Sequence, residues 1–600
     1  MKINPNVLAR KKLLALAVPM LMFGQAQAVE FEFGEASLTV DSQLSIGSSW
    51  RMEEQNKNLL NYTAPNTEVI DGNTSDDGNR NYEKGDAFSQ IFKGSHDLQF
   101  TYQNYGAFVR AKYWYDSAIE NNSVEHGHSP TYTLGGGTGT TVTFPGKSKI
   151  DDSDFNDLAK GKGATILDAF VYGSFDIGEM PLDVRLGKQV VSWGESTFIQ
   201  GGINSINPVD AAAFRRPGAE IKEGLLPVSM IYANLGLTDS LSVEAFYQLE
   251  WQETVGDGCG TYFSTSDVSS EGCNTLTFSG GAISLQRLED GDRGASDDGQ
   301  FGLSLRYFSD ELDTEFGFYA MNIHSRLPIY SVLGGSTGSA FPAAFGGSTV
   351  DAVLTGGYFM EYPEDIKLVG VSFAGNAYGV ALSGEVSHKM DAPVQVNGTF
   401  VTTMLATAGG PYSAESVAAS TEFWGGLDNH LGEEVSGYRT FDITQAQVTA
   451  IHLQNQVLGA SAVALIVEAG MNFVHDFDDV LRYGKSSIYQ APSFDGDSDF
   501  DGGFMTETSW GYRAVASAKY TNAFMGVDLN PVISFSHDVD GYAPSPGGQF
   551  QEDVKKLGLT LKANYLQRYD ASISYNMFMG GDFNDVKDRD FLAISAGVQF

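Results

Sequence analysis

Two adjacent arginines, Arg215 and Arg216, are the residues of this 600-residue chain whose type and spacing most clearly suggest binding chemistry. Paired guanidinium groups can hold a carboxylate or phosphate through parallel N–H donors. Trp193, Phe198 and Phe214 lie nearby in the sequence and could line an apolar path. One hypothesis is therefore a clamp for the anionic head of an amphipathic molecule.

A second hypothesis gives the arginines a structural role. The chain has 75 acidic and 37 basic side chains, a formal charge of −38. In such a protein the two arginines could form ion pairs that attach their own segment to a surrounding barrel wall, through carboxylates that alternation places on its inner face, such as Asp183, Glu244 or Glu250. The sequence leaves both hypotheses open, and each could hold for one arginine. The acidity argues against a nucleic-acid partner, since the phosphate backbone would be repelled.

The arginines belong to a polar stretch, residues 194–224, in which glycines and prolines set specific turns. Glu195, Asn207 and Asp210 complete the candidate binding set in and beside this stretch. Such a stretch needs a scaffold that surrounds it, and we expect it to fold inward as a plug within a barrel.

Catalytic or metal chemistry has weaker support in the sequence. None of the nine histidines lies in a serine-nucleophile or metalloprotease motif, so we expect no enzyme and no catalytic residue. Asp495, Asp497, Asp499 and Asp501 alternate ahead of two glycines, a spacing that could bring carboxylates onto Ca²⁺ or Mg²⁺, and such an ion could bridge to lipopolysaccharide phosphates. The stretch lacks the distal glutamate of an EF-hand, and an exposed polar loop is the alternative.

The two cysteines, Cys259 and Cys273, share one segment rich in glycine, serine and aspartate. Their spacing would close a short loop in an oxidising compartment, which predicts a disulfide that pins an external loop. Two thiols alone would make a poor zinc site.

The start of the chain is typical of an exported protein. Basic residues precede an apolar run over 13–23, and Ala26-Gln27-Ala28 resembles a cleavage site. That run is too short to span a bilayer as a helix. We interpret residues 1–28 as a signal peptide and residues 29–600 as one domain.

The end of the chain predicts how that domain meets the membrane. From Phe591 to Phe600, apolar residues alternate with small or polar ones, which is the pattern of a half-buried strand. A last strand that ends on an aromatic residue resembles the signal read by the outer-membrane barrel assembly machinery. Phe600 is therefore the predicted assembly signal, and the outer membrane with its lipid and lipopolysaccharide is the predicted location.

Connections between the predicted strands alternate in length along the chain. Eight short turns alternate with nine long polar segments, which gives about 18 antiparallel strands in an all-β transmembrane barrel with long extracellular loops. One clear strand has apolar residues at every second position from Leu241 to Trp251. The pattern is weakest over 364–374 and 441–455. A barrel this wide leaves a lumen unless something folds into it.

The most specific stretch runs from Gly187 to Pro227 and includes Trp193-Gly194-Glu195, Asn207-Pro208-Val209-Asp210 and Arg215-Arg216-Pro217-Gly218. It resembles the bacterial outer-membrane family catalogued as domain-of-unknown-function family 1302. The resemblance implies a barrel often encoded beside a periplasmic lipoprotein-sorting-like protein and an RND-type inner-membrane transporter, in settings of hydrophobic-compound metabolism. It implies movement of apolar or amphipathic molecules across the envelope and brings no catalytic residues.

Two other functions stay open at this stage. Predicted inward-facing charges such as Arg110, Lys112 and Arg185 would suit a general polar-solute porin. Long acidic segments over 53–88, 253–297 and 391–440 would suit a surface-display or adhesin barrel.

Overall fold

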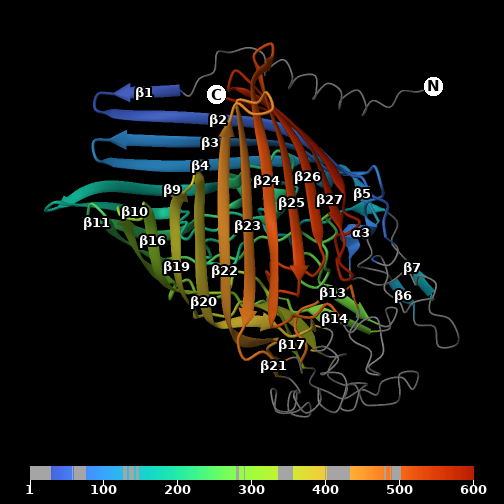
Figure 1. Ribbon diagram of the computed structural model, residues 1–600. Coiled ribbons are helices and arrows are strands. Elements are labelled where there is room, and N and C mark those ends of the chain that lie inside the picture. The colour runs from blue at the N-terminus through green and yellow to red at the C-terminus, as the bar shows by residue number, and fades with distance from the viewer. Residues whose placement is uncertain are drawn as a thin grey trace.

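Eighteen antiparallel strands close into a barrel in the computed structural model, because β28 (Phe591–Gln599) pairs with β2 (Ala36–Arg51). Figure 1 shows strands such as β22 to β27 side by side in the wall of this barrel. The structure describes residues 29–56, 59, 76–125, 131–133, 141–143, 147–278, 283–289, 291–334, 356–398, 401, 433–478, 481–486, 488–489 and 502–600. The predicted signal peptide and the aspartates Asp495, Asp497, Asp499 and Asp501 lie outside these residues.

The barrel strands follow one another around the ring in chain order. They are β2 (Ala36–Arg51), β3 (Ala87–Tyr102), β4 (Tyr105–Asp116), β9 (Lys162–Ile177), β10 (Met180–Gln189), β11 (Val228–Thr238), β12 (Leu241–Gln248), β15 (Phe301–Ser309), β16 (Thr314–Ile323), β19 (Ile366–Ala377), β20 (Val380–Gln395), β22 (Tyr438–Asn455), β23 (Ala462–Val474), β24 (Thr508–Phe524), β25 (Val527–Asp540), β26 (Lys555–Tyr565), β27 (Tyr569–Met579) and β28 (Phe591–Gln599).

The barrel closes next to the chain end. The backbone N–H of Phe600 donates to the carbonyl of Ser42 at 2.8 Å, and the Ser42 N–H donates back at 2.6 Å. Beyond this point β1 (Val29–Phe33) pairs with the first residues of β2. The role of Phe600 as an assembly signal stays a prediction. Its two backbone bonds to Ser42 complete the pairing at which the barrel closes.

Alternation sorts the wall into two faces, as predicted. In β15, Phe301, Leu303 and Leu305 are exposed on the outer face, whereas Gly302 and Ser304 are buried on the inner face. The apolar exterior replaces the hydrophobic core of a water-soluble protein.

The predicted order of connections is confirmed: eight short turns lie at one end and nine long segments at the other. The stretches with a weak pattern are full strands, β19 and β22. In β22 the pattern is weak because polar side chains such as Gln445 and Gln447 occupy the inward positions. The strand predicted to reach Trp251 ends at Gln248, because the Trp251 side chain leaves the wall to donate to the Ser325 carbonyl at 3.1 Å.

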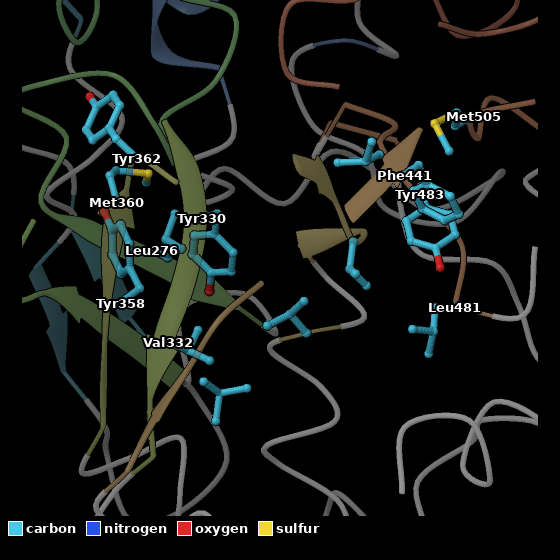
Figure 2. Close-up of a cluster of buried hydrophobic side chains, with 14 of the residues drawn as sticks. Leu276, Tyr330, Val332, Tyr358, Met360, Tyr362, Phe441, Leu481, Tyr483 and Met505 are labelled. Atoms are coloured by element: carbon cyan, nitrogen blue, oxygen red, sulfur yellow. The ribbon is translucent and has the colours of Figure 1, made fainter. Parts of the chain in front are cut away.

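The long segments pack against one another instead of forming separate polar loops. A small sheet of β13 (Thr275–Phe278), β14 (Ile283–Arg287), β17 (Ile329–Leu333), β18 (Gly357–Glu361) and β21 (Glu434–Val435) carries much of an apolar core (Figure 2). Tyr358 and Met360 in this core are fully buried. The extracellular end of the barrel is therefore a second packed region.

Short elements complete the described loops. They are α3 (Asp77–Arg80), α4 (Ser117–Asn121), β5 (Ser123–Val124), β6 (Thr131–Thr133), β7 (Thr141–Thr143), β8 (Ser148–Lys149), α5 (Ala211–Arg215) and α6 (Ile221–Gly224). Within the described ranges, no helix has the length and apolar character needed to cross a membrane.

Candidate functional site

Residues 194–224, called the inner segment below, lie against the inner face of the barrel. The wall residues that touch them alternate with the exposed apolar residues of the outer face, so they point into the lumen. Asn207 divides the inner segment into a first limb, residues 194–206, and a second limb, residues 208–224. The predicted infolding is present.

Glu385 of β20 holds both ends of a turn in the first limb. Its carboxylate accepts the backbone N–H groups of Glu195 at 2.6 Å and Ile203 at 3.0 Å. Gln447 of β22 donates to the same carboxylate at 2.9 Å. One buried side chain therefore satisfies loop backbone groups that would otherwise have no partner.

Glu468 of β23 holds the middle of the first limb in the same way. Its two oxygens accept the N–H groups of Thr197, Phe198 and Ile199 at 2.8, 2.6 and 2.9 Å. The Thr449 hydroxyl of β22 donates to it at 3.1 Å, and the Glu468 side chain is fully buried. Charge-assisted bonds of this kind are stronger than bonds between neutral groups.

Trp193 packs where the chain leaves β10 for the first limb. Its indole N–H donates to Glu244 at 2.6 Å, and its ring lies 5.0 Å from Phe246 and 5.9 Å from Tyr319. The side chain is fully buried. Trp193 therefore seals the first limb to the wall and does not line an open path.

Asn207 joins the two limbs at their base. Its side-chain oxygen accepts the Val191 N–H at 2.9 Å, and its amide donates to the Leu226 carbonyl at 2.9 Å and the Gln189 carbonyl at 3.3 Å. All of its bonds go to backbone at the ends of the excursion. Its place in the predicted binding set therefore corresponds to a structural clamp.

The second limb is held by lysines on the opposite part of the wall. Lys112 of β4 donates to Asp210 at 3.1 Å, and Asp210 also caps α5 by accepting the Ala213 N–H at 2.8 Å. Lys93 of β3 donates to both oxygens of Glu223 at 2.8 Å. Both pairs are almost fully buried, so each charge depends on its partner.

Glycines on the inner wall mark where the inner segment touches it. A Cβ atom added to Gly370 of β19 would lie 2.7 Å from Ile203, and one added to Gly470 of β23 would lie 2.9 Å from Ile199. A Cβ atom on Gly47 of β2 would lie 2.7 Å from Pro217. The two limbs thus reach well-separated parts of the ring at close packing distance.

Arg215 and Arg216 do not reach the wall carboxylates proposed from the sequence. Arg215 pairs with Asp257 and lies 4.8 Å from the ring of Phe263, and Arg216 donates to the Leu158 carbonyl at 2.7 Å. That part of the structural hypothesis is wrong because α5 lies under the extracellular segments.

The proposed wall carboxylates have other partners. Glu244 binds Trp193, Tyr232 and Arg306, and Asp183 accepts from Ser174 at 2.5 Å. Each was therefore correctly placed on the inner wall but was assigned the wrong contact.

The remaining candidate side chains are only partly covered. Phe214 is 37% exposed and lies against Gly224, and Phe198 and Glu195 are half-buried. Together with the exposed side of Arg215, these groups are the accessible part of the predicted binding set. They can contact a solute that passes the inner segment.

Glu385, Glu468 and Lys93 were missed as functional residues. Each is a charged residue within a barrel strand, on the inner face by alternation, and that was the available signal. The inner segment binds Glu385 and Glu468 through backbone N–H groups and not through basic side chains. Because nearly every residue type has a backbone N–H group, the sequence of the inner segment does not show that it binds them.

The packed long segments at the extracellular end of the barrel, called the extracellular cap below, hold the two cysteines next to the second limb. Cys259 and Cys273 form a disulfide with Cα atoms 5.3 Å apart, close to Asp257, the partner of Arg215. Burial raises the pKa of Asp257, and Arg215 opposes this rise. Burial and then Glu253 raise the pKa of Glu271 to about 7.

Between the inner segment and the periplasmic end, the two sides of the lumen differ. On β22, Ile451 and Leu453 share the inward face of Thr449 and are 38% and 58% exposed. On β10, the inward Arg185 is exposed over the ring of Tyr232 at 5.2 Å. Among the described residues Arg185 has no ion pair, so its charge is available to a solute. The side of the lumen at β22 is therefore apolar, and the side at β10 offers a cation.

The model for the family of proteins of unknown function DUF1302 matches residues 9–600, so the chain belongs to that family. No curated protein matches the sequence.

Solved structures similar to this chain include OccAB1 of Acinetobacter baumannii, with 11% identity and a TM-score of 0.39 over 96% of this chain and 99% of that one. OccD3 of Pseudomonas aeruginosa has 11% identity and a TM-score of 0.38 over 97% and 96%. The outer membrane channel DcaP of Acinetobacter baumannii has 8% identity and a TM-score of 0.33 over 96% and 100%.

A closed antiparallel barrel with an even number of strands and an apolar exterior is the form in which single-chain bacterial proteins cross the outer membrane. The described strands of this chain have each of these properties. The protein is therefore an outer-membrane barrel with channel-like architecture.

Proposed function

We propose that the protein moves hydrophobic or amphipathic molecules across the outer membrane, as one component of a system with a periplasmic lipoprotein-sorting-like protein and an RND-type inner-membrane transporter. The observation that carries this proposal is the two-sided periplasmic half of the lumen. Ile451 and Leu453 offer exposed apolar surface on one side, and on another side a cation is offered by Arg185, which has no ion pair among the described residues.

An amphipathic anion fits such a lumen better than a fully polar solute. Its alkyl part would lie along Ile451 and Leu453, where contact with apolar side chains removes hydrocarbon from water. Its head would meet Arg185, which binds carboxylates and phosphates through paired donors. The inner segment narrows the passage above this region and would gate it.

The experiment measures flux through the purified protein in vesicles. We expect Ile451→Asp with Leu453→Asp to lower the flux of a fluorescent alkyl carboxylate at least about tenfold, because losing two apolar contacts costs on the order of 2 kcal/mol. The matched control is Gln454→Asp, whose side chain has outward register on the same strand. Conductance of potassium chloride should change little in either variant.

Equal alkyl-carboxylate flux in the double variant and the wild type would contradict the proposal. A polar-solute porin is the second candidate, because the ion-paired Arg110 and the exposed Arg185 both face the lumen. Faster passage of a small sugar than of the alkyl carboxylate through the wild type would favour it. The packed extracellular cap would suit surface display, which predicts negligible flux of both solutes.

A further inference from the structure

The eight turns at the periplasmic end form two arcs of different character. The three consecutive turns that follow β3, β9 and β11 expose the polar residues Gln103, Glu179 and Asp239. The five consecutive turns that follow β15, β19, β22, β24 and β26 each expose a large apolar side chain. These side chains are Leu312, Tyr378, Leu458, Met525 and Leu566, which are 63%, 106%, 85%, 92% and 67% exposed.

The turns do not themselves require apolar residues at these positions. Tyr378, Leu458, Met525 and Leu566 have φ angles of 52°, 53°, 48° and 58°. Asn, Asp and Gly adopt this left-handed conformation more readily than large side chains do. The apolar side chains therefore oppose both the backbone preference and the hydration of the turn.

Charge distinguishes four of the five turns of the apolar arc from the rest of the molecule. The residues 376–380, 456–461, 522–527 and 564–567 contain no acidic side chain, although the chain has a net charge of −38, whereas the turn of Leu312 also carries Asp310, Glu311 and Asp313. The polar arc carries Glu179 and Asp239. A neutral, apolar surface of this kind suits an apolar protein face and would not attract a cationic partner.

Lipid does not explain the distribution, because a bilayer surrounds all sides of a barrel alike. Contact with the membrane interface would favour apolar tips on every turn, but three consecutive turns lack them. The apolar arc is also continuous with the cargo side of the lumen, since the strand that carries Ile451 and Leu453 runs directly into the turn of Leu458.

We propose that the apolar arc is the docking surface for a soluble periplasmic carrier protein whose apolar face exchanges cargo with the barrel. This inference rests on the proposed function and names the place where its periplasmic partner binds. Docking there would place the apolar face of the carrier beside the apolar side of the lumen, so the cargo would cross little water.

The first test asks whether the tips lie in lipid. Leu458→Cys is labelled with an environment-sensitive fluorophore in phosphatidylcholine vesicles with brominated acyl chains, and Ile573→Cys on the lipid-facing wall is the control. We expect strong bromine quenching at 573, and at 458 weak bromine quenching with strong quenching by aqueous iodide. Equal bromine quenching at the two positions would place the tips in lipid and overturn the proposal.

The second test uses cells. A photo-crosslinking amino acid at position 458 should give one protein adduct of discrete mass, whereas the same residue at position 103 should not. A variant that combines Tyr378→Asn, Met525→Asn and Leu566→Asn should reduce the yield of that adduct at least fivefold. It should also lower the uptake or efflux of the fluorescent alkyl carboxylate by cells. Asn suits the left-handed turn positions, so heat-modifiable assembly should persist.

An adduct of the same mass from position 103, no adduct at all, or unchanged transport in the Asn variant would overturn the docking proposal. Flux of the alkyl carboxylate through the purified Asn variant should equal that of the wild type. If only the docking proposal is wrong, the purified protein will still pass the alkyl carboxylate in vesicles. If the proposed function is wrong, this flux will be absent from the wild type as well.

Discussion

The two limbs of the inner segment are fastened to the barrel by opposite kinds of interaction. The first limb offers backbone N–H groups to two buried wall carboxylates, Glu385 and Glu468. The second limb offers its own carboxylates, Asp210 and Glu223, to buried wall lysines. The difference shows that the wall side chains, more than the sequence of the loop, determine where the first limb lies.

The limbs also differ in how many supports each has. Besides its two lysine pairs, the second limb has three further supports. Asp210 accepts from the first turn of α5, Gln43 donates to Glu220, and Arg215 and Arg216 contact the extracellular cap. Over 195–203 the described polar attachments of the first limb are those to Glu385 and Glu468 and one bond from Gln445 to the Gln200 carbonyl at 3.1 Å. We therefore expect the first limb to be released more readily.

The largest effect of a point variant should come from Glu385→Ala combined with Glu468→Ala. Five backbone N–H groups, two buried and three part-buried, would lose their acceptor, at about 1–3 kcal/mol for each group that stays both buried and unsatisfied. We expect single-channel conductance to rise severalfold and cells to become sensitive to large antibiotics. Unchanged conductance in an assembled double variant would show that the first limb is held by something else.

A smaller effect should follow from Lys93→Ala combined with Lys112→Ala. Each substitution leaves a buried carboxylate without its cation, which costs about 3–5 kcal/mol locally, but the other supports of the second limb remain. We expect conductance to rise by less than in the glutamate variant, together with faster hydrogen exchange over 208–224. Lys93→Arg with Lys112→Arg is the charge-preserving control, and a rise larger than that of the glutamate variant would reverse the comparison.

Arg215→Ala with Arg216→Ala should have a weaker effect again. The pair of Arg215 with Asp257 is partly exposed, and such pairs contribute about 1 kcal/mol or less. We expect a slight rise in conductance and no change at the first limb by hydrogen exchange. Loss of anion-dependent flux with unchanged conductance would instead support the anion clamp.

The smallest expected effect is a dependence on pH in the loop that carries the disulfide. The pKa of Glu271 is raised from 4.5 to about 7, so its contribution to folding is present below about pH 4.5 and is lost as the pH rises through about 7. Protection factors over 253–273, which correct hydrogen exchange for the base-catalysed rise in the intrinsic rate, should therefore be lower at pH 8 than at pH 5. Glu271→Gln should remove this difference, and the protection factors of the first limb should be equal at both values.

The sequence was sufficient to predict the barrel, because alternation along single strands and the lengths of connections are local properties. Eighteen strands and the end at which each turn lies follow from them, and the infolding of residues 194–224 was predicted from the width of such a barrel and the glycines and prolines of that segment. The extracellular core was not predicted, because its members, such as Tyr358 and Tyr483, come from segments distant in the sequence that pack only in three dimensions.

The candidate site was predicted only in part for the same reason. Arg215 and Arg216 stand out by type, but their partners depend on where α5 lies. The attachment of Glu385 and Glu468 leaves no mark on the inner segment, since backbone N–H groups are the donors. Trp193, Asn207 and Asp210 drew attention through their residue types, and their hydrogen bonds give them structural roles.

The central claim is that the inner segment crosses the lumen between two parts of the wall and narrows the passage. Single-channel recording of a variant that lacks residues 198–216, beside the wild type in the same planar bilayers, tests it most directly. The account predicts a conductance several times that of the wild type, above that of every point variant. Equal conductance in a correctly assembled deletion variant would place the segment outside the conducting path and contradict the account.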